Sequence, residues 1–89
     1  MEEIYLKITN AKDKYVGFKQ LKREAKTCDV DYVVLADDAE SEFKLKVEKI
    51  CADKGLTLFY APKKLELGKA AGISICSAVV TVLKSIDNA

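Results

Sequence analysis

The chain has 89 residues, of which 49% are hydrophobic and 33% charged, and its formal net charge is +1. This length suits one compact domain, residues 1–89, and leaves little room for a second. The nearly balanced charge argues against a protein that coats nucleic acid or anionic membranes by bulk attraction, so any polyanion site must be local.

The first half of the chain has the pattern of helix, short strand, helix and strand. We expect a helix over residues 2–11 and a brief extended segment around Tyr15 and Val16. Gly17 can open a second helix. Its core face would carry apolar residues at helical spacing, namely Phe18, Leu21, Ala25 and Cys28. The run "YVVLA", residues 32–36, is β-branched and aromatic in character, which predicts a central strand covered on both faces.

A longer helix and another strand follow. Residues 41–54 place apolar side chains at helical spacing, with Ser41 as the expected cap and Gly55 as the expected stop. The run "LTLFYA", residues 56–61, then predicts a strand.

The last two predicted elements are a short helix, which Pro62 introduces and Gly72 closes, and a strand over residues 74–83. Helices and strands therefore alternate along the chain. This order predicts an α/β domain, a three-layer α/β/α sandwich around a small mixed sheet of four strands.

Cysteine content and hydropathy indicate a reduced, cytoplasmic protein. The three cysteines have no metal-ligand spacing and the chain has no histidine, so we expect neither a metal nor a cofactor. Each cysteine lies among apolar neighbours, which predicts small buried hydrophobic residues rather than nucleophiles. The longest mostly apolar run, residues 73–83, is about half of the ~20 residues that a membrane-spanning helix requires, and the acidic start is unlike a signal peptide.

Cations are concentrated in one predicted helix. From Lys7 to Lys26 the chain carries seven Lys or Arg and two acids, whereas residues 27–60 carry four bases and eight acids. Four cations follow the i, i+3, i+4, i+7 pattern of one helix face: Lys19, Lys22, Arg23 and Lys26. Their like-charge i,i+4 pairs each cost roughly 0.2–0.5 kcal/mol. Two interpretations stay open, a solvated face or a face whose repulsion is relieved by an external anion.

The start of this helix adds groups that suit a phosphate and a base. Gly17 leaves the N–H groups of the first helical turn accessible to an anion. Gln20, one turn in, carries an amide that both donates and accepts, which suits base edges, although a plain surface glutamine is the commoner case.

Four stretches between residues 16 and 83 are informative together: "GFKQLKR", "VVLADDAES", "CADKGLTLFYAPKKLELGKAAGI" and "SICSAVVTVL". They resemble the kink-turn RNA-binding ribosomal proteins, the L-seven-Ae and L-thirty-e group, and "KKLELGKAAGI" is the most diagnostic part. The resemblance implies binding to a sharply bent RNA that contains tandem sheared G·A pairs and a flipped-out nucleotide. Ribosomal RNA is one candidate partner, in a ribosomal or ribosome-associated protein.

The resemblance also implies which residues meet the RNA. The helix start would read the G·A pairs and the backbone, the acidic turn after the central strand would meet the flipped base near Lys64, and an uncharged loop would pack against unstacked nucleotides. The expected RNA-binding residues are Gly17, Phe18, Lys19, Gln20, Lys22, Arg23, Lys26, Asp38, Glu40, Lys64, Ile73, Ser74, Ile75 and Cys76.

Several of these assignments compete with a purely structural explanation. The helix dipole favours acids in the first turn, which accounts for Glu40 equally well. One of Ile73 and Ile75 is expected to enter the core. Ser41 stands where the family usually has proline, Ser74 replaces a residue that is often charged, and Phe18 is bulkier than the usual small residue.

Nothing in the sequence indicates catalysis. The chain lacks a histidine for general-base work, a phosphate-binding P-loop and a nucleophile elbow, so we expect a monomeric, non-catalytic protein without a small-molecule substrate or membrane partner. An alternative function is a protein-interaction or assembly module whose basic helix face docks on an acidic partner.

Overall fold

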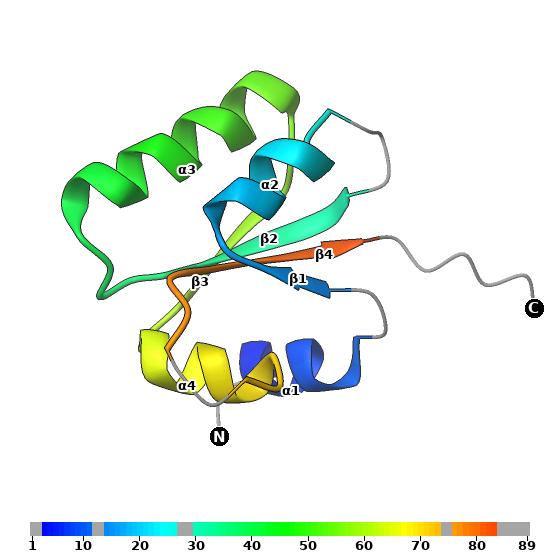
Figure 1. Ribbon diagram of the computed structural model, residues 1–89, viewed down its shortest axis with the longest axis vertical. Helices are drawn as coiled ribbons and strands as arrows, with labels where there is room; N and C mark the ends of the chain where they lie inside the picture. Colours follow the sequence, from blue (N-terminus) through cyan, green and yellow to red (C-terminus); the bar gives the residue numbers. More distant parts are fainter. Residues whose placement is uncertain (1–2, 12–13, 27–29, 74–75, 84–89) are drawn as a thin grey trace, which may run out of the picture.

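Helices and strands alternate along the whole described chain (Figure 1). The computed structural model of the protein describes residues 3–11, 14–26, 30–73 and 76–83. The elements are α1 (Glu3–Asn10), β1 (Lys14–Val16), α2 (Phe18–Glu24), β2 (Val30–Ala36), α3 (Ser41–Lys54), β3 (Leu58–Ala61), α4 (Lys64–Ala70) and β4 (Val79–Leu83).

The four strands form one mixed sheet in the order β1-β4-β2-β3. β2 pairs with β3 in parallel, whereas β4 lies antiparallel to both β1 and β2. The carboxyl ends of β1, β2 and β3 therefore meet the start of β4 at one end of the sheet. This end is where the expected site residues would have to gather.

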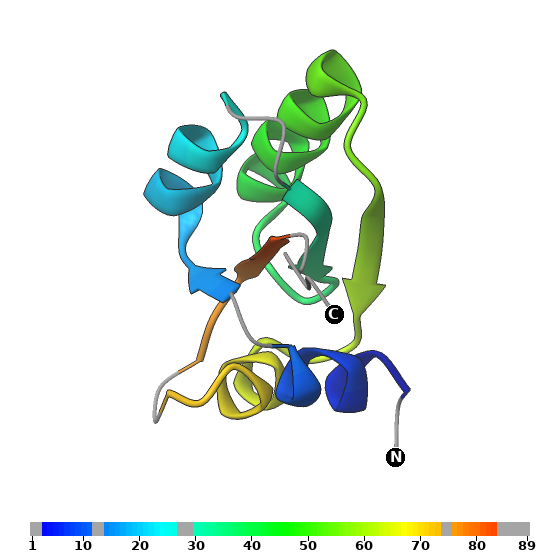
Figure 2. The same cartoon turned by 90° about the vertical axis from the view of Figure 1, so that its right-hand side faces the viewer.

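Helices cover both faces of the sheet, which confirms the three-layer α/β/α prediction. Figure 2 shows α1 and α4 on one side of the sheet and α2 and α3 on the other. β2 supplies alternate side chains to the two cores, with Val34 in the α1–α4 core and Val33 and Leu35 in the α2–α3 core. The continuous apolar run of β2 follows from this double coverage.

Some element boundaries differ from the prediction. β2 begins at Val30 rather than at residue 32, because its ladder with β4 extends to the pair Val30–Leu83. β3 begins at Leu58 rather than at residue 56, because the Leu56 N–H closes α3 by donating to the Cys51 carbonyl at 2.8 Å. The opening helix ends at Asn10, one residue earlier than expected.

The last strand is shorter than predicted, since β4 covers residues 79–83 and not residues 74–83. Ser77 explains part of the difference. Its N–H donates to the Lys64 carbonyl at 3.0 Å, and its hydroxyl donates to the Val79 carbonyl at 2.9 Å, so these groups hold a loop and not a strand ladder. An apolar sequence alone does not show whether such a segment forms a strand or a loop.

The expected cap of α3 is also wrong. Glu40, not Ser41, occupies the N-cap position, and its side chain makes no capping hydrogen bond. The predicted stop at Gly55 is confirmed, since this residue ends the helix in the left-handed region. Among the described residues, no helix has the length and apolar content needed to cross a bilayer.

Candidate nucleic-acid interface

Gly17 joins the end of β1 to the start of α2. Its φ of 106° and ψ of 158° lie in a region that is essentially restricted to glycine. Its N–H donates to the Val79 carbonyl at 3.1 Å, and its carbonyl accepts from the Leu21 N–H at 3.2 Å. The space that a side chain would occupy is open, with nothing within 4 Å. Gly17 therefore fixes the start of α2 to β4 and leaves the outer side of this helix start accessible.

The cations of α2 are exposed, as predicted, but they do not all lie on the helix. Lys19, Lys22 and Arg23 are within α2 and exposed. Lys26 is exposed but follows the helix, which ends at Glu24. Its N–H donates to the Arg23 carbonyl at 3.3 Å in a turn. The expected i, i+7 position of Lys26 on a continuous helix is therefore wrong, although its charge stays beside the others.

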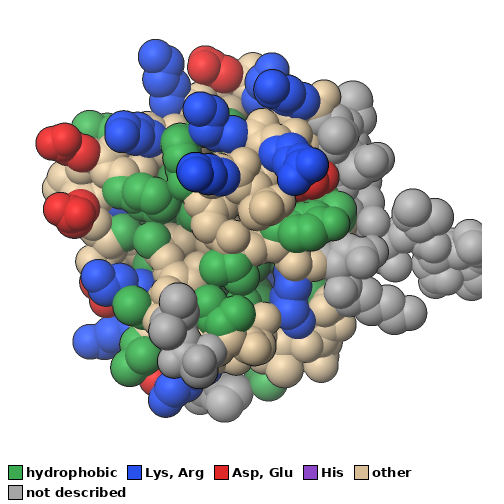
Figure 3. Space-filling view, viewed as in Figure 1, with side chains coloured by type: hydrophobic (Ala, Val, Ile, Leu, Met, Phe, Trp, Pro, Cys, Tyr) green, Lys and Arg blue, Asp and Glu red, His purple; other side chains and the backbone are tan. Residues whose placement is uncertain are grey.

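Other cations from the N-terminal part of the chain have partners inside the fold. The ammonium of Lys7 lies 5.0 Å from the ring centroids of both Tyr32 and Phe59. The ammonium of Lys14 donates to carbonyls at the end of α1, among them that of Ile8 at 3.1 Å. Within the described part of the chain, the side chains of Lys19 and Arg23 have no such contact and no ion pair. The basic excess seen in the sequence therefore becomes a local surface, which Figure 3 shows over α2 and the adjoining part of α3.

Phe18 connects α2 to the neighbouring helix. Its half-buried ring meets the ring of Phe43 edge-to-face, with centroids 5.7 Å apart. The ammonium of Lys22 lies 5.9 Å from the Phe18 ring centroid. Gln20 is half-buried at the start of the same helix. The bulky Phe18 therefore has a packing role in addition to its expected place at the interface.

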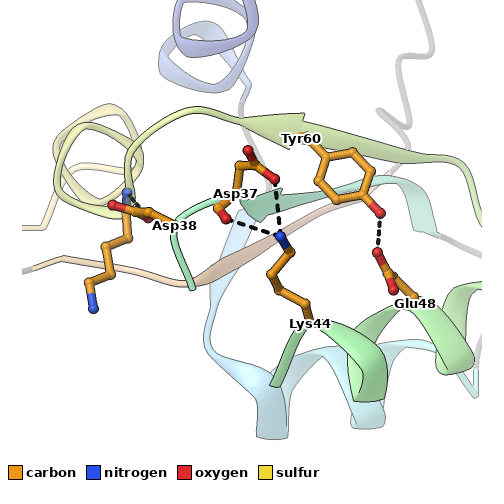
Figure 4. A network of polar contacts seen from close by, with 6 residues as sticks. Asp37, Asp38, Lys44, Glu48 and Tyr60 are labelled. Carbon is orange, nitrogen blue, oxygen red and sulfur yellow. Dashed lines mark hydrogen bonds and ion pairs between the residues drawn. The ribbon is translucent and has the colours of Figure 1, made fainter. Parts of the chain in front are cut away.

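The acidic turn after β2 is held by hydrogen bonds from two directions. The Lys44 ammonium donates to the carboxylate and to the carbonyl of Asp37, each at 3.1 Å (Figure 4). The Asp38 carboxylate accepts from the Lys64 N–H at 2.8 Å. Since the α4 N-cap residue, Lys63, has no side-chain capping bond, Asp38 caps this helix from a distant part of the chain.

Asp38 and Glu40 thus have different surroundings, although both are exposed. One oxygen of Asp38 is engaged in capping α4, whereas the Glu40 carboxylate makes no capping bond to α3. Lys64 supplies the backbone donor to Asp38, while its side chain is exposed. Of the two acids, Glu40 is the one whose carboxylate the fold leaves available to a ligand.

A second polar contact ties β3 to α3. The Tyr60 hydroxyl donates to the Glu48 carboxylate (Figure 4). This hydrogen bond is the main cause that raises the pKa of Tyr60 to about 12, with desolvation as a smaller cause. Together with the Lys44–Asp37 pair, it fixes α3 against the carboxyl ends of β2 and β3.

Backbone hydrogen bonds anchor the loop that precedes β4 on both sides, at Ile73 and at Ser77. The Ile73 N–H donates to the Gly68 carbonyl at 3.1 Å, and the Ser77 N–H donates to the Lys64 carbonyl at 3.0 Å. Ile73 is half-buried. Ser74 and Ile75 lie outside the described residues, so their expected roles stay predictions.

The prediction that all three cysteines are buried is wrong for Cys76. This residue is exposed, whereas Cys51 is buried and Cys28 lies outside the described residues. Burial, followed by the nearby Glu48 charge, raises the pKa of the Cys51 thiol. Cys76 differs because it belongs to the loop and not to the predicted long strand.

The starts of α2 and α4, the acidic turn and the start of β4 converge on one end of the sheet. The Ala36 N–H donates to the Ala78 carbonyl at 2.8 Å, and Gly17 is bonded to Val79, so the end of β2 and the start of α2 both adjoin the start of β4. The Asp38–Lys64 bond adds the start of α4. The later cations, Lys22, Arg23 and Lys26, follow α2 away from this end (Figure 1).

The sequence-based set omits residues that shape this surface. The Tyr5 hydroxyl accepts from the Lys63 N–H at 2.9 Å and so ties α1 to the start of α4, a contact across 58 positions that no local pattern reveals. Lys46 and Lys49 are exposed on α3. Their spacing, which keeps both outside the apolar face of that helix, is a signal that the sequence does contain.

Comparisons with known proteins find similar chains and a similar fold. A protein of Halalkalibacterium halodurans named RNA-binding protein is 35% identical over 80 residues, which are 90% of this chain and 98% of that protein. The large ribosomal subunit protein eL8 of Nitrosopumilus maritimus is 36% identical over 56 residues, which are 62% of this chain and 44% of that protein. Among solved structures, the Giardia lamblia 15.5kD RNA binding protein has a TM-score of 0.78 at 24% identity, over 96% of this chain and 78% of that one, which supports the fold.

The sequence model of one family matches residues 2–88, almost the whole chain. This match covers the glycine-opened helix, the acidic turn and the loop before β4 together, in agreement with the resemblance first seen in their sequence motifs. The chain therefore belongs to the ribosomal protein L7Ae/L30e/S12e/Gadd45 family.

Proposed function

We propose that the protein is a non-catalytic RNA-binding protein that recognises kink-turn RNA through the end of the sheet where α2 and β4 begin. The observation that carries the proposal is the convergence of a glycine-opened basic helix, an acidic turn and an uncharged loop at that end. The relatives named as RNA-binding proteins support the nucleic-acid part of the proposal. We further propose that the protein acts in the cytoplasm, as a ribosomal or ribosome-associated monomer.

Charge supports a local RNA contact. Lys19, Lys22 and Arg23 are exposed and without ion pairs within the described part of the chain, while the net charge of the whole protein is +1. Phosphates that approach α2 therefore meet a local positive field. Such a distribution favours one docking orientation over general attraction to polyanions.

The acidic turn adds selectivity. A carboxylate repels loosely placed phosphates but accepts hydrogen bonds from base N–H groups. We assign the contact with the flipped nucleotide to Glu40, whose carboxylate makes no capping bond. Asp38 is assigned a positioning role, since its carboxylate holds the start of α4 and with it Lys64.

The test compares two RNAs that differ only at the kink. One carries the tandem sheared G·A pairs, and in the other Watson–Crick pairs replace them. In gel-shift titrations at moderate ionic strength, we expect the replacement to weaken binding by roughly two orders of magnitude, since each lost specific position costs ~1–3 kcal/mol. Equal affinity for both RNAs would refute the proposed function.

Two variants test the site. Arg23→Ala is expected to weaken binding to both RNAs and to lower the salt slope by about one unit, as for the loss of one phosphate contact. Gln20→Ala is expected to reduce the preference for the G·A pairs. Lys69→Ala is the control, since it removes an exposed cation from α4 on the other face of the sheet. If Arg23→Ala and Gln20→Ala both bound like the parent and the control, the site assignment would be wrong.

A further inference from the structure

The basic surface does not end at α2. Lys46 and Lys49 on α3 are both exposed, and neither has an ion pair among the residues that the structure describes. By contrast, Lys44 on the same helix is bonded to Asp37. Lys46 and Lys49, like Lys54 at the end of the helix, therefore have no ion pair within the described part of the chain.

Packing places α3, which carries these lysines, beside α2. Phe43 of α3 contacts Phe18 of α2 edge-to-face, so the two helices lie side by side in one layer (Figure 2). Lys46 lines an open depression at the start of α3 together with Phe43 and two acids, Glu40 and Glu42. Figure 3 shows Lys and Arg side chains over both helices on one face of the molecule.

Acids on α3 reduce but do not cancel this field. Glu42 precedes Lys46 by four positions and Asp53 follows Lys49 by four, and both acids are exposed. Neither acid is within ion-pair distance of these lysines. With the α2 cations and Lys26 included, the exposed surface of the two helices keeps an excess of positive charge.

The composition of this surface suits phosphates better than a protein partner. Protein interfaces have cores rich in exposed apolar and aromatic side chains. Of the large hydrophobic residues that the described chain exposes, Leu45 is the one on α2 or α3. A polyanion that runs across both helices gains several charge contacts without such a core.

We infer that Lys46 and Lys49 contact the phosphates of an RNA stem beyond the kink, so that the protein holds one arm of its RNA through α3 as well as the bend through α2. This inference rests on the proposed function and names an additional partner surface, the stem backbone. The kink itself would be recognised without these lysines.

The experiment uses three RNAs: a minimal kink-turn with short stems and two versions in which one or the other stem is longer by several base pairs. Affinities and salt slopes are measured for the parent, for Lys46→Gln/Lys49→Gln, and for the control Lys54→Gln/Lys69→Gln. The control removes the same charge from exposed positions at the end of α3 and on α4. Thermal unfolding confirms that both variants are folded.

We expect one longer RNA to bind the parent more tightly than the minimal RNA. On that RNA, the Lys46/Lys49 variant should lose about three- to thirtyfold in affinity and about 1–2 units of salt slope, because two phosphate contacts are removed. On the minimal RNA it should match the control. This pattern would support the inference.

Other results overturn it in distinguishable ways. If the variant and the control behave alike on every RNA while the parent still prefers intact G·A pairs, the α3 contact is wrong and the proposed function stands. If the variant is equally weak on short and long RNAs, the lysines contact the kink and not a stem. If poly-glutamate binds the parent and not the variant, with no effect of stem length, the surface serves an acidic protein. A parent without any preference for the kink refutes the proposed function itself.

Discussion

Replacement of Gly17 by alanine tests how the start of α2 is built. The backbone there has a φ of 106° and a ψ of 158°, and strain of this kind costs an L-residue ~1–3 kcal/mol. No atom lies within 4 Å of the added methyl group, so the cost is conformational and not steric. Alanine also lowers the entropy of the unfolded chain, which offsets ~0.4–1 kcal/mol. We expect a net loss of about 1–2 kcal/mol in the free energy of unfolding, or roughly 4–8 °C in melting temperature per kcal/mol.

The same substitution should affect RNA binding for a separable reason. The free variant can relax by rotating Gly17 out of its native conformation, with loss of the bond to the Val79 carbonyl. If RNA binds only the native helix start, binding must return the introduced alanine to the strained backbone conformation. A strain of ~1–2 kcal/mol then lowers the affinity by about five- to thirtyfold.

Gly55→Ala provides the matched control. Gly55 has a φ of 68° and equally open surroundings, but it ends α3, far along the chain from the proposed site. A left-handed alanine there should cost ~1–2 kcal/mol of stability. Unfolding is followed by circular dichroism and binding by calorimetry with a kink-turn RNA. Comparable RNA affinity for the two variants would refute the role of Gly17, and a D-alanine at position 17 of a synthetic chain should recover both properties.

Three further changes test contacts of the fold. Asp38→Ala should lower the free energy of unfolding by ~0.5–2 kcal/mol through loss of the α4 cap, whereas Asp38→Asn should keep most of that stability. Thermal unfolding measures both, and equal losses in the two variants would exclude capping by Asp38. Tyr60 should titrate near pH 12, so its bond to Glu48 stabilises the protein fully below about pH 10 and is lost as the pH rises through about 12. The pKa is measured from the tyrosinate absorbance that disappears in Tyr60→Phe, and a pKa near 10.0 would contradict the prediction. Leu67→Ala should lower the free energy of unfolding by ~2–5 kcal/mol because Leu67 is fully buried, whereas Leu65→Ala, at an exposed position, should change it by less than ~0.5 kcal/mol. Urea titrations measure both changes, and similar losses would contradict the packing of α4 through Leu67.

The architecture was predictable because its signals are local. The period of apolar residues separates α3 from its neighbouring strands, and Gly55 marks the end of that helix. The unbroken run of β2 indicates burial on both faces, which the two cores confirm.

The errors arise where distant segments decide the outcome. Ser77 is buried yet belongs to a loop, because its N–H is taken by the Lys64 carbonyl, 13 positions earlier in the chain. Asp38 acts as a cap for a helix that begins 26 residues later. Propensity and period carry no information about such pairings, so they predict a strand over residues 74–83 that is longer than β4.

In the candidate site, too, local features are predictable from the sequence and long-range contacts are not. The exposed cations of α2 follow from helical spacing, but the end of the helix before Lys26 does not. The convergence of Gly17 with the start of β4 depends on the strand order, with β4 between β1 and β2, which the chain order of elements leaves open. The motifs indicated which residues belong together, and the sheet explains how they meet.

The most direct test of the account is a map of backbone amide chemical shifts during titration with a kink-turn RNA. We predict that the largest changes occur at Gly17–Gln20, at Glu40 and at the loop around Cys76, with little change in α1. Shifts concentrated on α1 and α4 instead would contradict the claim that the end of the sheet where α2 and β4 begin holds the RNA.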